Sequence, residues 1–346
     1  MNDKYILKKD HLVAFLRRIK KHGRLVAPTK NRQGDTLFEE IESLDRAEID
    51  LDNQCQTSVK RFLFPQQETI FTYSLTPEEG FVFKPRFTAE PTIYFGLRSC
   101  DLSAILYMDV IFLHNGKDPY YLHRRQNSIL ISLGCNEPFP NCFCYATKNG
   151  PFLDLGYDLQ FTDLGDRFFV EPGRAKGGDL VREWRHFLEP AKTEDAKAQY
   201  QISLEARGRF KKRVEVEQAT KKLAAGEVSD SIFSELSKRC QDCGGCAYIC
   251  PTCTCFTITD RPLSENTGER IRSWDACTFA GFTAMAGGHN PVNKRRQALR
   301  KRFLHKLHQD VVKHHRPSCV GCGRCVGMCF DGVDIIRFIN MVCKQD

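Results

Sequence analysis

The sequence predicts an α+β protein in which an N-terminal α/β domain precedes a mainly helical, cysteine-rich domain. Two observations support this division. Short β-rich runs alternate with helical runs in the first part of the 346 residues, the pattern of strand, helix and parallel strand. Farther along, cysteines recur at short fixed spacings within sequence rich in helix formers. We expect an α/β domain at 1–200, a helical connector at 201–235 and the helical domain at 236–346.

The β–α–β alternation is clearest around two cysteines. TIYFGLRSCD (92–101) predicts a strand, LSAILYMDVIFL (102–113) a helix, and SILISLGCNEP (128–138) a second, parallel strand. Cys100 and Cys135 each stand where a strand is expected to end. Ligand sites in open α/β sheets gather at such ends, so this edge is a candidate site.

Composition indicates a cytoplasmic protein. Seventeen cysteines in a chain of ordinary apolar content, 41%, are better explained as ligands than as disulfides in a reducing compartment. The N-terminus has charges among its apolar residues, with an amphipathic helix expected at Leu12 to Ile19, and lacks the apolar core of a signal peptide. Apolar runs are shorter than the roughly eighteen residues that a membrane span needs, so none is expected.

Two cysteine motifs of identical spacing carry the chemistry of the second domain. Each reads C-x2-C-x2-C-x3-C, the spacing of bacterial ferredoxins that bind two [4Fe–4S] clusters. In that arrangement three cysteines of a motif hold one cube and the fourth reaches across to the other. We therefore expect two cross-ligated clusters. Their ligand sets are Cys240, Cys243, Cys246 and Cys329 for one cluster, and Cys319, Cys322, Cys325 and Cys250 for the other.

Residues around these motifs refine the expectation. Glycines lie beside the ligands at positions 244, 245, 321 and 323. They allow the backbone to bend around each cube and direct N–H groups toward sulfur. Phe330 stands where a proline normally follows the fourth cysteine, which changes the local turn and removes no ligand. The 68 residues between the motifs are rich in helix formers, which favours a helical version of the two-cluster fold.

The alternative to iron–sulfur clusters at these motifs is a pair of zinc sites. Zinc sites usually show CxxC pairs without the third CxxC and the x3 step. A zinc protein of this kind would be colourless, so the spacing favours clusters and the colour of the protein tests the choice.

Four further cysteines lie in the N-terminal domain. Two stand at expected strand ends and two follow on the next loop; they are Cys100, Cys135, Cys142 and Cys144. Because these positions would converge on one side of the sheet, they supply ligands for a third [4Fe–4S] cluster. The alternative is a group of buried or redox-active thiols.

The remaining cysteines have no complete pattern. Cys253, Cys255 and Cys277 could contribute to another centre, but three thiolates fall short of the four that a cube takes. The simpler interpretation is burial near the clusters. Cys55 and Cys343 are expected to be thiols that bind no metal.

In the order of its motifs the chain resembles the electron-transfer family that includes the iron–sulfur subunit of anaerobic sulfite reductase and the beta subunit of sulfhydrogenases. The resemblance rests on RSCD, GCNEPFPNCFC, CQDCGGCAYICPTCTCF, GERIRSWDACTFAGFTAMAGGHN, the basic helix ending near FLHK, and CVGCGRCVGMC. It implies an electron-transfer role between a subunit that binds flavin (FAD) and NAD(P) and another that is catalytic. The catalytic partner would be a sulfite reductase, a NiFe hydrogenase or a heterodisulfide-reductase-like assembly.

Missing motifs also favour a relay over a catalyst. The sequence has no GxGxxG after a strand, no GxxxxGK[ST] and no HExxH. A cluster whose irons are all held by cysteine has no open position for substrate. We therefore expect a non-catalytic subunit that relays single electrons in a cytoplasmic oxidoreductase complex of anaerobic metabolism. The alternative is a self-sufficient iron–sulfur reductase whose N-terminal cysteines hold a substrate-reducing centre.

The net charge of +8 is concentrated in a basic helix at 294–316. Such a run can bind nucleic acid, but no aromatic platform or DNA-reading motif accompanies it, so nucleic acid is not an expected partner. It could dock an acidic partner or lower the cost of adding electrons to nearby anionic clusters. It could also be the solvated face of an amphipathic helix.

Overall fold

An eight-stranded mixed sheet organises the first part of the chain in the computed structural model, which describes residues 4–87, 90–114, 116–173 and 175–344. Its strands are β1 (Tyr5–Lys8), β2 (Arg24–Lys30), β3 (Thr36–Glu40), β6 (Thr92–Leu97), β7 (Ser128–Leu133), β8 (Leu159–Asp163), β9 (Arg167–Pro172) and β10 (Glu189–Pro190). They follow the order β10-β1-β9-β8-β7-β6-β2-β3. The neighbours β2, β6, β7 and β8 pair in parallel, and the strands on either side pair antiparallel.

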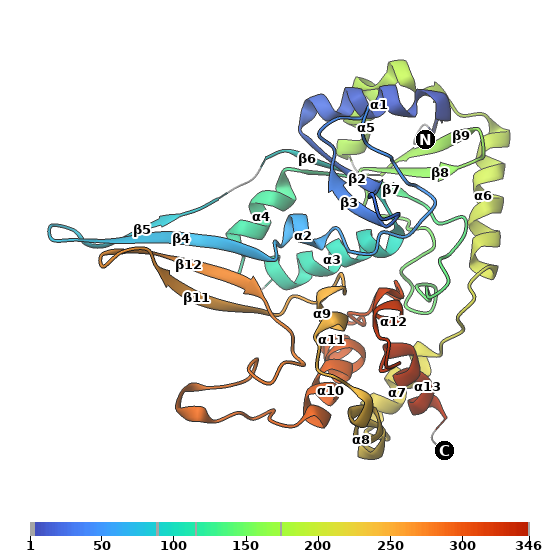
Figure 1. Cartoon of the computed structure of the whole chain (residues 1–346). Helices are drawn as coiled ribbons and strands as arrows, with labels where there is room; N and C mark the ends of the chain where they lie inside the picture. Colours follow the sequence, from blue (N-terminus) through green and yellow to red (C-terminus); the bar gives the residue numbers. More distant parts are fainter. Residues whose placement is uncertain (1–3, 88–89, 115, 174, 345–346) are drawn as a thin grey trace.

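Helices cover both faces of this sheet (Figure 1). They are α1 (Leu12–Ile19), α2 (Lys60–Leu63), α3 (Ser99–Leu113), α4 (Pro119–Gln126) and α5 (Ala175–Glu183). On one face Phe15 of α1 packs edge-on against Trp184, 5.5 Å between ring centroids. On the other, Leu102 and Ile105 of α3 join a core with Tyr94 of β6. The predicted β–α–β alternation is therefore confirmed.

A second sheet of four antiparallel strands projects from the body (Figure 1). Its strands are β4 (Gln67–Thr76), β5 (Gly80–Pro85), β11 (Phe256–Pro262) and β12 (Thr267–Trp274), in the order β11-β12-β4-β5. It joins segments that are distant in sequence, with Thr72 opposite Glu269. At its base the buried Arg272 forms ion pairs with Glu68 and Asp118.

We expected mainly helical structure between the two motifs, but this sheet takes two of its strands from that segment. The segment after Cys255 forms the hairpin of β11 and β12. FTITDRP contains three consecutive β-branched residues, which favour a strand, and every residue of β11 is exposed. The hairpin lies within a region whose remaining elements are helices, so the expected fold class is confirmed with one β element added.

The second part of the chain is mainly helical. Its helices are α6 (Thr193–Gly208), α7 (Val216–Ala225), α8 (Asp230–Arg239), α9 (Gly245–Tyr248), α10 (Arg295–Leu304), a π-helical turn (His305–Gln309), α11 (Asp310–His314), α12 (Arg324–Met328) and α13 (Ile335–Cys343). Their core includes Phe303 stacked on Phe338, 4.3 Å between ring centroids. Among the described residues, no helix is both long and apolar enough to cross a membrane.

Candidate metal centres

The first predicted set of cysteines lines one small cavity near the surface, here called the outer cavity. Its cysteines are Cys240, Cys243, Cys246 and Cys329. Cys240 directly follows α8, Cys246 lies in α9 and Cys329 directly follows α12. Cys243 is exposed and the other three are partly exposed. Segments from both motifs therefore meet at this cavity.

Backbone amides are directed at sulfur around the outer cavity. The N–H of Asp242 donates to Cys240 Sγ at 3.5 Å, and that of Val333 donates to Cys329 Sγ at 3.2 Å. Gly244, with φ of +71°, is the N-cap residue of α9, and a Cβ there would lie 2.4 Å from the Phe279 ring. Glycine is therefore required by both the turn and the packing at this position.

The second predicted set lines a separate cavity, here called the inner cavity, in which the cysteines are more deeply buried. Its cysteines are Cys250, Cys319, Cys322 and Cys325. The first three are buried. Burial raises the pKa of the Cys319 thiol to about 12, and a cysteine ligates iron as the thiolate. A positive centre would stabilise that ligand form.

Both cavities fit a [4Fe–4S] cube by the number and type of their donors. Each brings four cysteines together, and the fourth cysteine of each motif lies in the cavity of the other motif. Within the described ranges, no three His, Cys, Asp or Glu side chains converge as the ligands of a single metal ion do. Sulfurs that line the wall of a cavity suit a cube, because its four irons take separate thiolates.

The four N-terminal cysteines also come together. Cys100 lies in the first turn of α3, Cys135 follows β7, and Cys142 and Cys144 lie on the loop after it. All four are buried, between 3% and 6% exposed. Burial raises the pKa of each thiol, that of Cys142 to about 12, and neighbouring thiols of the same set add to the rise for Cys100, Cys142 and Cys144. The structure thus assembles the complete predicted set.

The N-terminal cysteine loop packs directly against the second motif. The N–H of Phe143 donates to the carbonyl of Gly321 at 2.8 Å. Gly321 has φ of +67°, and a Cβ there would lie 2.6 Å from the Cα of Cys144. The Sγ of Cys142 lies 3.5 Å from the carbonyl oxygen of Cys322. The N-terminal set is therefore adjacent to the inner cavity, and Gly321 is required by this contact as well as by the turn.

A buried ion pair supports the same junction. Arg324 Nη1 lies 2.9 Å from Asp101 Oδ1, with both side chains almost fully buried. Arg324 Nε also donates to the carbonyl of Cys55 at 2.8 Å. Cys55 is buried, while Cys343 lies in α13 and its Sγ is 3.5 Å from the carbonyl of Glu215. Neither lines one of the two cavities.

Of the three cysteines without a complete pattern, Cys253 is a neighbour of Cys250 of the inner cavity, and Cys255 is a neighbour of Cys277. The neighbouring Cys253 side chain lowers the pKa of Cys250, and the Cys277 side chain lowers the pKa of Cys255. The carbonyl of Cys253 accepts from Lys60 Nζ at 2.9 Å. Burial lowers the pKa of Lys60 to about 8. No sequence signal singled out this lysine, because it stands in a short helix remote from both motifs.

Arg302 and Lys306 are two more buried cations. They belong to the basic segment at 294–316, and the sequence did not distinguish them from its exposed residues. Both line the inner cavity. Burial opposes the charge of Arg302, but the sulfurs of Cys246 and Cys325 raise its pKa well above the ordinary value. Lys306 Nζ donates to Thr252 Oγ1 at 3.1 Å. The burial of these two positions depends on the tertiary packing of α10 and of the π-helical turn that follows it, which charge alone does not reveal.

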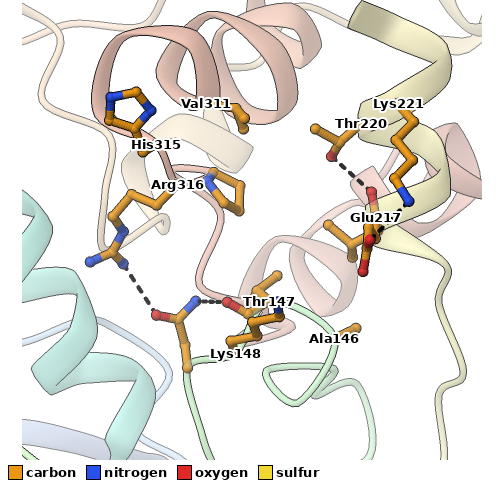
Figure 2. Close-up of a pocket in the computed structure, with 12 residues that line it drawn as sticks. Ala146, Thr147, Lys148, Glu217, Thr220, Lys221, Val311, His315 and Arg316 are labelled. Atoms are coloured by element: carbon orange, nitrogen blue, oxygen red, sulfur yellow. Dashed lines mark hydrogen bonds and ion pairs between the residues drawn. The ribbon is translucent and has the colours of Figure 1, made fainter.

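A larger pocket of about 520 Å³ lies near the N-terminal loop (Figure 2). It is lined by residues 146–149, by part of α7 and by 311–317. Two pairs of its polar side chains contact each other: Lys221 with Glu217 at 3.0 Å, and Arg316 with Asn149 at 3.1 Å. Its twelve lining residues include no cysteine. We therefore assign it no part in holding a cluster.

Comparison with known proteins agrees with the cysteine geometry. The profile of the 4Fe–4S dicluster domain matches residues 239–333. The chain is also 28% identical over 338 residues to sulfhydrogenase 2 subunit beta of Pyrococcus furiosus. That alignment covers 97% of this chain and 97% of the relative. The similarity thus extends through the N-terminal sheet as well as the matched domain.

Proposed function

Because the chain is homologous to a sulfhydrogenase beta subunit along nearly its whole length and contains a 4Fe–4S dicluster domain, we propose that it relays single electrons within an oxidoreductase complex. It would work in the cytoplasm between a subunit that binds FAD and NAD(P) and a catalytic subunit. Of the three catalytic partners expected from the sequence, the name of the relative favours the sulfhydrogenase, a NiFe hydrogenase type.

The observation that carries this proposal is the pairing of the two motifs across two cavities. Each cavity contains one complete set of four cysteines, three from one motif and one from the other. In the proposed ligation the outer set holds one cube and the inner set holds the second. The N-terminal set, packed against Cys322, would hold a third cube. The three sites then follow one another from the surface into the α/β domain.

The residues of the chain have separate tasks in such a relay. A bound [4Fe–4S] cluster supplies one-electron transfer without making or breaking a covalent bond to a substrate. The cysteines fix the positions of the three sites, and the amides of Asp242 and Val333 donate to sulfur and stabilise its negative charge. The exposed Cys243 marks where the outer site is accessible to a partner.

Anaerobic purification of the complete chain tests the proposal. Iron and sulfide analysis should give about twelve of each per chain for three cubes, and about eight for two. A colourless protein without iron would overturn it. Purification of the native complex should recover the flavin subunit and the catalytic subunit together with this chain.

The isolated chain should accept electrons from dithionite and deliver them to a one-electron dye. It should not oxidise NADH or NADPH, nor reduce sulfite, because electron relay alone provides no substrate site. Steady turnover of any of these substrates by the flavin-free chain would instead support the self-sufficient reductase.

A further inference from the structure

We propose that Arg302 is a shared electrostatic positioning residue, which raises the reduction potentials of both the outer and the inner cluster. Lys306 acts in the same way mainly on the inner cluster. This inference rests on the proposed function, since it requires clusters at the two cavities. It adds to that function two residues of the chain that control how readily the relay accepts an electron.

The first support is the burial of the two cations. The relative exposure of Arg302 is 2% and that of Lys306 is 3%. They lie four residues apart, Arg302 in α10 and Lys306 in the π-helical turn that follows, so they point to the same side of this helical segment. Moving a charge from water into a protein interior is costly unless an opposite charge compensates it.

The second support is that Arg302 lacks a conventional partner. Among the residues that the structure describes, its Nε and Nη1 atoms have no hydrogen-bond acceptor. The other deeply buried arginines are neutralised by carboxylates: Arg324 by Asp101, and Arg272 by Glu68 and Asp118. Arg324 also has guanidinium nitrogens without a hydrogen-bond acceptor, so the difference is that Arg302 has no carboxylate partner within the described part of the chain, as expected beside an anionic group.

The third support is the position of Arg302 between the two cysteine sets. It lines the inner cavity with Cys250 and Cys325. The same helix reaches the outer cavity one turn earlier, where Leu299 forms part of its wall. Cys246 of the outer set is among the sulfurs that raise the pKa of Arg302. Lys306 also lines the inner cavity, and its strongest interactions with sulfur are with Cys250 and Cys253. Arg302 thus lies on the turn of α10 between the outer and inner cavities, whereas Lys306 lies one turn farther along, beside the inner cavity.

The neighbouring basic residues of α10 do not share this environment. Arg295 pairs with Asp242 at 2.7 Å, and Arg296 and Arg300 lie 3.3 and 3.8 Å from Asp230. Their side chains are 43% to 53% exposed, so water screens their charge. The basic helix therefore has two roles: its exposed residues form surface ion pairs, and its two buried residues face the cavities.

The physical effect follows from the charge that each reduction adds. One electron enters a cluster from the flavin subunit of the proposed complex, and the negative charge of the site grows by one. A fixed positive charge in a poorly hydrated interior stabilises the reduced form more than the oxidised form. Removing Arg302 should therefore make reduction of both clusters less favourable, while removing Lys306 should affect mainly the inner one.

The test is a redox titration followed by EPR spectroscopy on the complete, anaerobically prepared chain. In Arg302→Met, which keeps a long apolar side chain, both midpoint potentials should shift to more negative values. In Lys306→Met the inner cluster should shift more than the outer one. Arg302→Lys should stay closer to the wild type, and the exposed Arg300→Met is the matched control, in which neither potential should move.

Iron analysis of each protein distinguishes failure of the proposed function from failure of the inference about Arg302. Absence of iron–sulfur clusters from the wild-type protein would refute the proposed function itself. Full iron content with unchanged potentials in Arg302→Met would overturn the inference alone, as would an equal shift in Arg300→Met. If Arg302→Met loses iron while Arg302→Lys keeps it, retention of the clusters requires a positive charge at this position, and the electrostatic role of Arg302 is supported. Loss from both variants would assign Arg302 a packing role and overturn the inference.

Discussion

The outer and inner cavities are built from motifs of identical spacing and yet differ in their environment. At the outer cavity Cys243 is exposed, and its walls include Phe330, which is 81% exposed. At the inner cavity three of the four cysteines are buried, and the N-terminal loop packs against one side. The surrounding chain, not the motif, therefore decides how far each cysteine set is exposed, and in the proposed relay the outer site would meet a partner while the inner site would connect the other two.

The substitution with the largest expected effect is Cys250→Ser, which tests the difference between the outer and inner cavities. Because Cys250 lies in the inner cavity, this variant should lose the inner cluster, about four of about twelve iron atoms per chain. It should also interrupt electron transfer between the outer site and the N-terminal site. Iron analysis and EPR spectroscopy of the reduced protein measure both effects. Retention of the inner signal with loss of the outer one would show that Cys250 serves the cluster of its own motif.

Next in size is the combined change of Cys100 and Cys135 to Ala. It should remove about four iron atoms while leaving the interacting EPR signals of the outer and inner clusters in place. Cys343→Ala is the control, since that thiol lies in α13 and outside both cavities, and its iron content should equal that of the wild type. An unchanged iron content in the double variant would mean that the N-terminal cysteines are ordinary buried thiols.

The difference in exposure predicts an order of iron loss. When a water-soluble iron chelator is added to the oxidised protein, the outer cluster should be lost before the inner one, because only the outer set includes an exposed cysteine. The decay of visible absorbance, combined with EPR of samples taken at intervals, follows each cluster. Simultaneous loss of both would indicate that global unfolding, rather than local access, controls the release.

A smaller effect is expected from Gly321→Ala. The backbone at Gly321 has φ of +67°, and a Cβ there would lie 2.6 Å from the Cα of Cys144. The left-handed backbone alone costs a residue with a side chain about 1–3 kcal/mol, and the clash adds to it, so the free energy of unfolding in a denaturant titration should fall by at least that amount. Gly281→Ala is the matched control, because a Cβ at Gly281 has no neighbour within 4 Å. Equal stability of the two variants would contradict the close packing of the N-terminal loop on the second motif.

Local patterns were sufficient to predict much of the fold and the cysteine sets. Alternating β-rich and helical runs predicted β6, α3 and β7, and the amphipathic period predicted α1 at Leu12–Ile19. The cross-ligated sets followed from spacing, and the structure brings the same residues together, although ligation by them stays a prediction. These features depend on residues close in sequence or on a spacing with one common geometric solution.

Features that depend on distant contacts were not predictable in the same way. The pairing of β12 with β4 requires a partner far away in the chain, which no local period reveals. Arg302 looks like the other arginines of α10 until the packing of that helix decides which face is buried. The approach of Gly321 to Cys144 is likewise a tertiary contact, so the sequence explained this glycine by the cube alone.

The four-stranded sheet has a consequence for biogenesis of the protein. During translation β4 and β5 emerge long before β11 and β12, so their hairpin has to wait with the β4 edge unpaired. Unpaired strand edges invite association with other chains, and contacts between distant segments form late. At the base of the four-stranded sheet lies Arg272, whose partners Glu68 and Asp118 are synthesised with the first half of the chain. Until this arginine leaves the ribosome, the nascent chain has an unpaired strand edge and two carboxylates that lack their arginine partner. This is the stage of synthesis at which a chaperone would be most useful.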